Sequence, residues 1–383
     1  IYLFNIFTSL AIGVVLLGVK SIPRLTDKRY RRAKKYVGLA AILIAVGNAI
    51  VLSKGMASYS VDMFSIDILT LLGWQACLFT FSVITLFHSS FVTRRNVLIN
   101  LAPTALFLVI YLIVYAINGD VEVRSFAEYA ENISNPTLLL RTLFSIVLAV
   151  QYVNYIRIFR RERRFYIDKI NNHFADTSDY ELCWGSSIFY KAAFLGFSVL
   201  LLCIYSDPIA DGILTFCVTL FYLDFAIRYI NYQHTLFYAL PTITKPSEEI
   251  APIFEELLKN GKATEKETSI ELVPSELGKK LEQLIKAKKP HLTHGLVISD
   301  LSRPLKVTDK QLSFYISNTY GVRFNKWINT LRIEHAKGVA KENPAISFDE
   351  IVEQSGFSDG SNFSRVFKQT TGITYKKFKN SLL

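Results

Sequence analysis

The sequence predicts an all-α protein, in which a bundle of seven transmembrane helices precedes two helix-turn-helix units. Three observations predict this fold class. Apolar runs recur up to about residue 231, basic and acidic loops alternate between these runs, and short helical patterns with turn signals follow His291. The 383 residues are 51% hydrophobic yet carry a net charge of +11. Apolar and basic character lie in different stretches, which predicts a membrane part and a soluble part.

Each apolar run has close to the ~20 residues that a helix needs to cross roughly 30 Å of hydrocarbon. The seven runs are Ile1–Val19, Tyr36–Leu52, Ile68–Phe87, Val97–Ile117, Leu138–Tyr155, Ile188–Tyr205 and Ile213–Ile230. We expect them to form one domain over residues 1–231. The chain starts inside an apolar run and without Met, so we expect that residues preceding Ile1 are missing.

The charges of the loops predict the orientation of the spans. The first loop, Lys20–Lys35, contains eight Lys and Arg against Asp27 alone, and the third and fifth loops are also basic. The second, fourth and sixth loops are neutral or acidic. Because basic loops stay in the cytoplasm, we expect residue 1 outside and everything after Ile230 inside. The outer loops are short, the longest being Asn118–Pro136, so no separate extracellular sensor domain is expected.

Three charged residues near the cytoplasmic ends of the last two spans are candidates for sensing or for structure. A charge in the centre of a membrane costs about 2.5–3.5 kcal/mol on insertion scales, so such groups are usually paired. Lys191 and Asp224 are expected at matching depths, which favours an ion pair between two helices. Alternatively, Lys191 extends to the headgroups and Asp224 pairs with Arg228 one turn away.

Three further polar residues are weaker candidates for lining a pocket in the bundle. Arg141 is expected near the outer end of the fifth span, and Asn48 and Gln75 lie within the second and third spans. No series of carboxylates crosses the bundle, which argues against a proton-coupled pump.

Residues 232–290 have a soluble composition and form a predicted connector. A helix is expected over about Ser275–Lys288, because its apolar residues share one face. That face has two interpretations. It is a dimer contact that transmits a signal, or it packs on the first helix of the following module.

Residues 291–383 show the pattern of two helix-turn-helix units joined by a long helix. Thr308-x-x-Gln311 and Ser347-x-x-Glu350 both fit the capping box, which marks a helix start. Gly356 supplies a permissive turn. Helices are expected over about Thr308–Tyr320, Phe324–Lys341, from Ser347, and Gly360–Thr370. In the last two, the residues expected to face inward are Phe348, Ile351, Phe363, Val366 and Phe367.

The region from about Leu292 to Lys379 resembles the DNA-binding domain of AraC-type transcription regulators. The resemblance rests on the linker-helix motif Leu331–Lys337 (LRIEHAK), on Ile351–Asp359 (IVEQSGFSD), on Phe363–Lys368 (FSRVFK) and on Thr371–Thr374 (TGIT). It covers about a quarter of the chain. A multi-span N-terminal part on such a module is similar, in architecture only, to membrane-embedded regulators of Bacteroidota-like bacteria.

The resemblance implies which residues contact DNA. In the first unit they are Thr308, Lys310, Ser313 and Phe314. In the second unit they are Asp359, Ser361, Ser364, Arg365 and Lys368. From Leu292 onward, 13 Lys and Arg outnumber 8 Asp and Glu, which predicts salt-sensitive binding to phosphates.

The sequence departs from the family pattern at four positions. Pro304 is expected to interrupt the leading helix of the first unit, Ser302 replaces the usual Ala, and Phe314 stands where polar residues are commoner. Tyr375 replaces the usual Pro. We therefore expect the first unit to read DNA weakly and the second to discriminate most.

Taken together, these features imply a membrane-embedded one-component transcription regulator in the inner membrane of a bacterium, with its C-terminal domain in the cytoplasm. Its implied partners are double-stranded promoter DNA, membrane lipids, an unidentified small-molecule or membrane signal, and a second copy in a homodimer. The alternative is a transporter or membrane receptor whose C-terminal module binds protein. The sequence contains no nucleotide-binding glycine loop, nucleophile elbow or metal cluster. We therefore expect no enzyme activity, catalytic residue, metal or cofactor.

Overall fold

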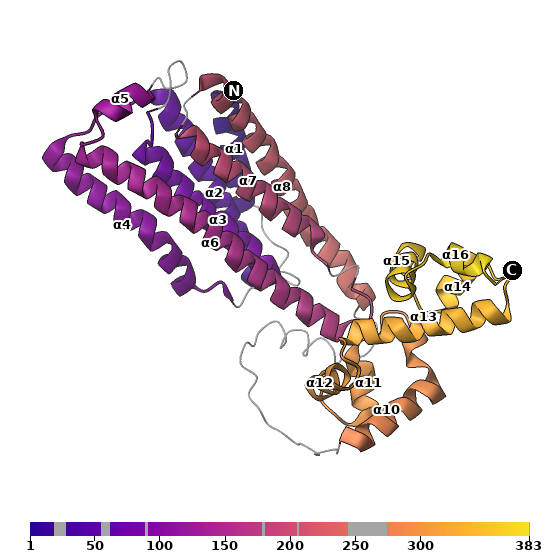
Figure 1. Ribbon diagram of the computed structural model, residues 1–383. Coiled ribbons are helices and arrows are strands. Elements are labelled where there is room, and N and C mark those ends of the chain that lie inside the picture. Colours follow the sequence, from indigo (N-terminus) through magenta and orange to yellow (C-terminus); the bar gives the residue numbers. More distant parts are fainter. Residues whose placement is uncertain are drawn as a thin grey trace. The chain divides into compact units, whose positions relative to one another are not determined.

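The computed structural model describes residues 1–18, 28–54, 62–88, 91–177, 181–204, 207–243 and 274–382. These residues contain helices and no strand, and the all-α prediction is confirmed (Figure 1). They divide into two compact units. The N-terminal unit comprises Ile1–Arg163 and Leu182–Ala263, and the C-terminal unit comprises Arg164–Glu181 and Thr264–Leu383.

The N-terminal unit is a bundle of long helices with one short helix, α5 (Phe126–Glu131). The long helices are α1 (Tyr2–Gly18), α2 (Lys28–Ser53), α3 (Ile66–Phe87), α4 (Arg94–Asn118), α6 (Pro136–His173), α7 (Cys183–Leu202) and α8 (Pro208–Ile243). Helix α3 is the central one, since 72% of its apolar window is buried, against 17% for α4. The outward faces of the other helices expose large apolar side chains such as Phe7, Leu98 and Phe194, which suits contact with lipid.

Six of the described helices are long and apolar enough to cross a membrane, and α1 is a shorter apolar helix. The six correspond to the second to seventh predicted spans. The predicted count of seven therefore stays a prediction, because it depends on α1.

Helices α1 and α2 approach each other closely at two glycines. A Cβ atom on Gly13 would lie 3.0 Å from the carbonyl oxygen of Gly38, and one on Gly38 would lie 3.2 Å from the carbonyl oxygen of Gly13. Small residues at a crossing allow two backbones to touch, which is how helices associate where water does not drive them together. This contact holds α1 against the bundle.

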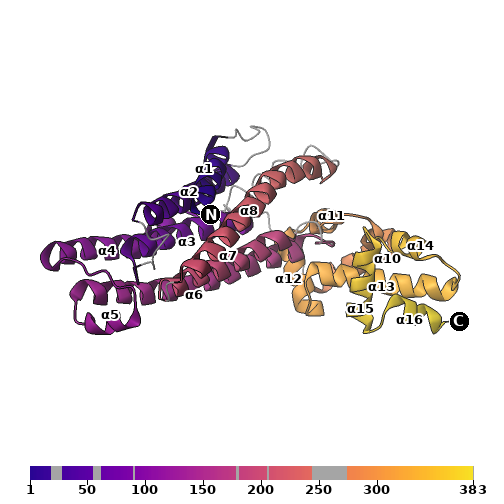
Figure 2. The same ribbon diagram turned by 90° about the horizontal axis from the view of Figure 1, so that it is seen from above.

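The C-terminal unit contains two helix pairs on either side of a long helix, α13 (Phe324–Glu342) (Figures 1 and 2). The first pair is α11 (Ile298–Leu305) and α12 (Asp309–Tyr320), with α10 (Pro274–Lys288) packed on α11. The second pair is α14 (Phe348–Gln354) and α15 (Gly360–Thr371), followed by α16 (Tyr375–Asn380). Each pair has its own apolar cluster, and α13 contributes to both.

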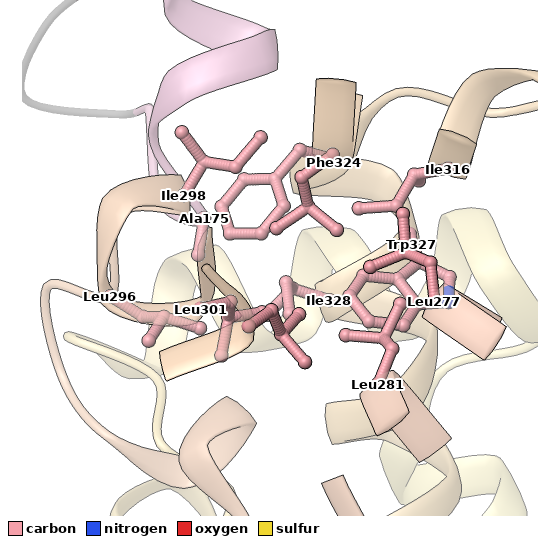
Figure 3. Close-up of a cluster of buried hydrophobic side chains, with 12 residues drawn as sticks. Ala175, Leu277, Leu281, Leu296, Ile298, Leu301, Ile316, Phe324, Trp327 and Ile328 are labelled. Atoms are coloured by element: carbon pink, nitrogen blue, oxygen red, sulfur yellow. The ribbon is translucent and has the colours of Figure 1, made fainter. Parts of the chain in front are cut away.

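The first cluster resolves the two interpretations of the amphipathic connector helix. Leu277 and Leu281 of α10 are buried in it with Leu301 of α11 (Figure 3), and Leu305 of α11 belongs to the same cluster. The apolar face of α10 therefore packs on the first helix of the module, and it is not free to form a dimer contact.

The unit boundaries differ from the predicted division into residues 1–231, 232–290 and 291–383. Residues 164–181 lie between two apolar helices of the N-terminal unit in sequence, yet they group with the C-terminal unit. Ala175 is fully buried in the first apolar cluster, beside Ile298 and Leu301 (Figure 3). Its amide N–H donates to the carbonyl oxygen of Leu296 over 3.0 Å.

Two expectations about single residues were wrong. Pro304 does not interrupt α11, which runs through it to Leu305. Because Pro304 stands in the last turn, it removes one helix hydrogen bond and leaves the rest of this short helix intact. Phe348 is 41% exposed and covers the edge of Phe363 with its ring centroid 5.8 Å away. The helix start at Ser347 places it on the rim of the cluster, while Ile351 is fully buried as expected.

Candidate nucleic-acid interface

The first helix pair positions α12 through a complete capping box. The Thr308 hydroxyl accepts a hydrogen bond from the Gln311 amide at 3.2 Å, and the Gln311 side chain accepts one from the Thr308 amide at 2.9 Å. This reciprocal pair satisfies N–H groups that a helix start otherwise leaves free. Thr308 therefore fixes where α12 begins.

The predicted DNA-contacting residues of α12 lie on its solvent side. Lys310 is exposed, Ser313 is partly exposed, and Phe314 is 67% exposed. The opposite side of the helix buries Leu312 and Ile316 completely. An exposed phenyl ring offers van der Waals contact, for example to a thymine methyl group, but no hydrogen bond.

The second helix pair depends on Gly356 in its turn. Gly356 has φ of +75°, and a Cβ atom there would lie 2.5 Å from the carbonyl oxygen of Leu292. Only glycine combines that backbone conformation with such a close approach of main chain. The permissive turn predicted from the sequence is confirmed, and the structure adds that the turn packs directly on the segment before α11.

The helix α15 separates an aromatic face from a polar face. Phe363, Val366 and Phe367 are buried against Phe357 and Tyr375. The opposite face exposes the polar and basic side chains Ser361, Ser364, Arg365 and Lys368. These side chains can donate and accept hydrogen bonds at base edges and phosphates.

Two polar residues orient the polar face of α15. The Asp359 carboxylate caps the helix by accepting from the Asn362 amide at 2.7 Å. Asn362 is buried, and its side-chain oxygen accepts from Arg365 Nη2 at 2.8 Å. The Asp359 carboxylate therefore fixes where α15 begins, and the hydrogen bond to buried Asn362 holds the Arg365 side chain in place at the surface.

The sequence analysis missed the role of Arg332 in joining the two helix pairs. Its side chain is fully buried in α13. Nε donates to the His291 carbonyl oxygen at 2.7 Å, and Nη2 donates to the Thr293 carbonyl oxygen at 2.9 Å. The guanidinium also lies 5.4 Å from the centre of the Phe357 ring. Burial lowers the pKa of Arg332 to about 10, so it stays charged at neutral pH. The motif Leu331–Lys337 includes this arginine, but local spacing carries no sign of its distant carbonyl partners.

The sequence analysis also missed a set of contacts from residues 168–176 to both helix pairs, which we call the strap. At the start of α13, Asp168 pairs with Arg323 at 2.8 Å, and Asn171 accepts a hydrogen bond from Asn325 at 2.9 Å. On the first pair, Ala175 packs in the apolar cluster. On the second pair, the Ser358 hydroxyl donates to Asp176 beside the start of α15. No local sequence pattern predicts these contacts, because they join residues more than 150 positions apart.

The three charged residues expected near the ends of the last two spans show one of the two predicted arrangements. Arg228 Nε donates to both carboxylate oxygens of Asp224, at 2.8 and 3.0 Å, one helical turn away. Lys191 is exposed, and no ion pair joins it to Asp224 among the described residues. The pairing within one helix is therefore present, and the interhelical pair is absent from this structure.

Arg141 forms a clamp between loops at one end of the bundle. It is fully buried, and Nη1 lies 2.5 Å from an oxygen of Asp62 and 3.5 Å from one of Asp120. Nη2 donates to the Val121 carbonyl oxygen at 2.9 Å. A buried arginine costs free energy unless its charge is paired, and Asp62 provides the close partner while Asp120 lies further away. Arg141 does not line the bundle's cavity, whereas Asn48 and Gln75 do.

The comparisons with known proteins agree with the geometry of the C-terminal unit. The family model of a helix-turn-helix domain matches residues 301–381. The chain is 33% identical over 101 residues to an uncharacterised HTH-type transcriptional regulator of Staphylococcus aureus (strain COL), a match that covers 26% of this chain and 13% of that protein. It is 32% identical over 96 residues to the uncharacterised transcriptional regulatory protein YesN of Bacillus subtilis (strain 168), which covers 22% of this chain and 26% of YesN.

The chain thus spans only a small part of the relatives that it matches, and no solved structure matches it. The matched family, the two capped helix pairs and the polar faces of α12 and α15 all lie in one region. Residues 301–381 are an AraC-type helix-turn-helix domain, joined in this chain to a region of long apolar helices.

Proposed function

We propose that this protein is a membrane-embedded one-component transcription regulator, in which a transmembrane bundle senses a signal and the C-terminal unit binds promoter DNA. The observation that carries the proposal is the helix α6. Its first part is apolar and packs in the N-terminal unit, while residues from Arg164 onward belong to the DNA-binding unit. One unbroken helix therefore links the two functions covalently.

The strap gives this link a means of acting on both helix pairs. Asp168 and Asn171 lie on α6 itself and hold the start of α13, while Ala175 fills the first apolar cluster. Asp176 reaches Ser358, which precedes the cap of α15. A shift or rotation of α6 would move these contacts together, and a domain with two discrete arrangements could then gain or lose affinity for a two-site operator.

DNA binding is proposed to occur through the exposed faces of α12 and α15. Two recognition helices on one rigid linker helix can enter successive major grooves. Arg365 and Lys368 supply positive charge on the second helix, and Lys310 supplies it on the first. Promoter sites are the class of partner that such a double reader fits, because phosphate contacts position it and base contacts select a sequence.

The experiment that tests the proposal uses full-length protein in lipid nanodiscs. Its preferred site is first selected from random double-stranded DNA, and binding to labelled site DNA is then measured by fluorescence anisotropy. The double variant Arg365→Ala and Lys368→Ala should lose affinity for the selected site by at least about tenfold. The control variant Lys376→Ala and Lys377→Ala removes the same charge from α16 and should lose much less. Equal losses would mean that the basic charge alone binds DNA, without readout by α15.

A second experiment tests the orientation in the membrane. Reporter fusions after residues 124 and 164 of the full chain distinguish the two sides of a bacterial inner membrane. The proposal expects an outside signal at 124 and an inside signal at 164, because basic loops stay in the cytoplasm. The reverse result would place the DNA-binding unit on the wrong side. Failure to select any DNA sequence would favour the alternative, a transporter or receptor with a protein-binding module.

A further inference from the structure

A cavity of about 170 Å³ lies within the N-terminal unit, between α1, α2, α3, α6, α7 and α8. It extends along α8 from Asp207 to Tyr222, which is about 22 Å at 1.5 Å per residue. An apolar protein cavity of about 150 Å³ is large enough to bind benzene. The space is therefore sufficient for a ring-sized organic molecule with a short chain.

The walls of the cavity combine aromatic rings with a small number of polar groups. Phe79, Phe189 and Phe221 are among the rings that line it. Polar side chains converge on it from different helices: Asn48 Nδ2 donates to Asn5 Oδ1 at 3.3 Å, and Gln75 Nε2 donates to the Tyr222 hydroxyl at 3.1 Å. A mostly apolar pocket with a few fixed polar groups is the usual form of a small-molecule site.

The charged residues among the described lining of the cavity are all acidic. Asp207 and Asp211 at the start of α8 both line the cavity, and none of the described residues around it is Lys, Arg or His. The Tyr2 hydroxyl donates to one oxygen of Asp211, which orients that carboxylate. An anionic ligand would meet two carboxylates without a cation to compensate, whereas a protonated amine would meet opposite charge and aromatic faces.

A separate observation also indicates a ligand. The side chain of Tyr152 is buried, with the residue 8% exposed, and it lines the cavity. Among the residues that the structure describes, no hydrogen bond is found to its hydroxyl group. The hydroxyl oxygen is not among the fully buried atoms that lack a partner, so it stays accessible to a molecule in the cavity. An amine or hydroxyl group of a bound molecule would provide one.

We propose that this cavity binds a small protonated amine with an aromatic or aliphatic body of about one ring. The ammonium group faces Asp211 and Asp207, and the apolar body lies among the rings further along α8. The carboxylates stand at the end of α8 predicted to lie outside, so the amine enters from there. That this amine is the signal rests on the proposed function; that it occupies the cavity does not.

The test measures saturable binding of radiolabelled 2-phenylethylamine to the full-length protein in nanodiscs, with competition by unlabelled molecules of matched size. The amine should compete best, 2-phenylethanol should compete about tenfold less well, and the anion 3-phenylpropanoate should not compete. The variant Asp211→Asn should weaken the amine about tenfold and leave the alcohol nearly unchanged.

Two neighbouring substitutions provide a matched control for the cavity itself. Ala193 lines the cavity, whereas Phe194 is 72% exposed on the outer surface of the same helix. Ala193→Trp fills the space and should abolish binding of the amine and of the alcohol. Phe194→Trp should change neither. Size-exclusion profiles of both variants show whether they remain folded.

The proposal is overturned if 3-phenylpropanoate competes as well as the amine, or if none of the three molecules binds saturably. It is also overturned if Ala193→Trp binds the amine normally, because the measured binding would then be partition into lipid. DNA affinity measured in the same nanodiscs separates the two proposals. Amine binding without any change in DNA affinity leaves the site standing and removes its role as the signal. Operator binding without amine binding leaves the proposed function standing and removes the site.

Discussion

The two helix pairs of the C-terminal unit differ in what completes their cores. The cluster of the first pair includes Ala175 of the strap and Leu277 and Leu281 of α10, all outside the helix-turn-helix domain proper. The cluster of the second pair is built only from residues that follow Arg332. The first pair is therefore completed by other parts of the chain, while the second is nearly self-contained.

This difference suggests a division of labour. If α6 moves as proposed, the helix pair whose core includes Ala175, just beyond α6, would be displaced with it, because packed cores transmit small shifts. The second pair keeps its shape and presents the polar face of α15, with Arg365 held by Asn362. Under the proposed function, the first pair would receive the signal and the second would read DNA.

The largest expected effect is on the turn of the second pair. Gly356→Ala adds a Cβ atom 2.5 Å from a main-chain oxygen and imposes a positive φ on alanine, so we expect a loss of about 3 kcal/mol or more in the unfolding free energy. Hydrogen exchange of α14 and α15 in the full-length protein measures it. Gly372→Ala is the matched control, because its φ is +79° but its Cβ meets open space; about 1 kcal/mol is expected. Similar losses in both variants would show that the contact with Leu292 contributes nothing.

A smaller effect is expected from overfilling the first cluster. Ala175→Leu inserts three carbon atoms into a fully buried position, which typically costs about 2 kcal/mol. We expect faster hydrogen exchange in α11 and α12 and little change in α14 and α15. The exposed Ala345→Leu serves as control. Equal acceleration in both helix pairs would show that they unfold as one, and the comparison between them would fail.

The two recognition helices should contribute unequally to DNA affinity. Arg365→Ala should lose about 1.5 kcal/mol at the selected site, roughly tenfold, with relaxed preference at one base pair. Lys310→Ala in the first pair should lose less and weaken all sequences alike, as a phosphate contact does. Anisotropy titrations at two salt concentrations distinguish these cases. A larger loss at Lys310 would reverse the assignment of reader and receiver.

A further expected effect concerns pH. His291 lies in the turn before α11, with its ring 6.3 Å from that of His335 on α13. Burial is the main cause that lowers the pKa of His291 to about 4, with His335, Arg332 and Lys289 adding positive charge nearby. In the unfolded chain His291 takes up a proton near pH 6.5, whereas in the folded protein it stays neutral to about pH 4. The contribution of neutral His291 to the free energy of unfolding is therefore fully present above pH 6.5 and is lost as pH falls toward about 4. Thermal unfolding from pH 7 to 4.5 should show a shallower decline in His291→Asn than in the unchanged protein. Parallel curves would exclude His291 as the cause.

Much of the fold could be predicted because its signals are local. The local signals are the apolar runs, the capping boxes at Thr308 and Ser347, and Gly356 in the turn. Each affects only residues close to it in sequence, and the described helices start and end near these signals. The polar face of α15 follows from helical periodicity in the same way. The matched helix-turn-helix family supports this part of the prediction.

The tertiary structure alone decided which distant groups meet. Arg332 carried no signal in the sequence, and Arg141 was expected to line a pocket. Both side chains are buried instead: Arg332 donates to two main-chain carbonyl oxygens, and Arg141 pairs with carboxylates from loops. The strap, the unit boundary at Arg164 and the cavity along α8 likewise depend on contacts between segments far apart in the chain. Periodicity and capping act among residues close in sequence, so they specify each helix from its own residues. Burial and ion pairing depend on residues that are far apart in sequence and meet only when the helices pack. The local sequence therefore cannot specify them.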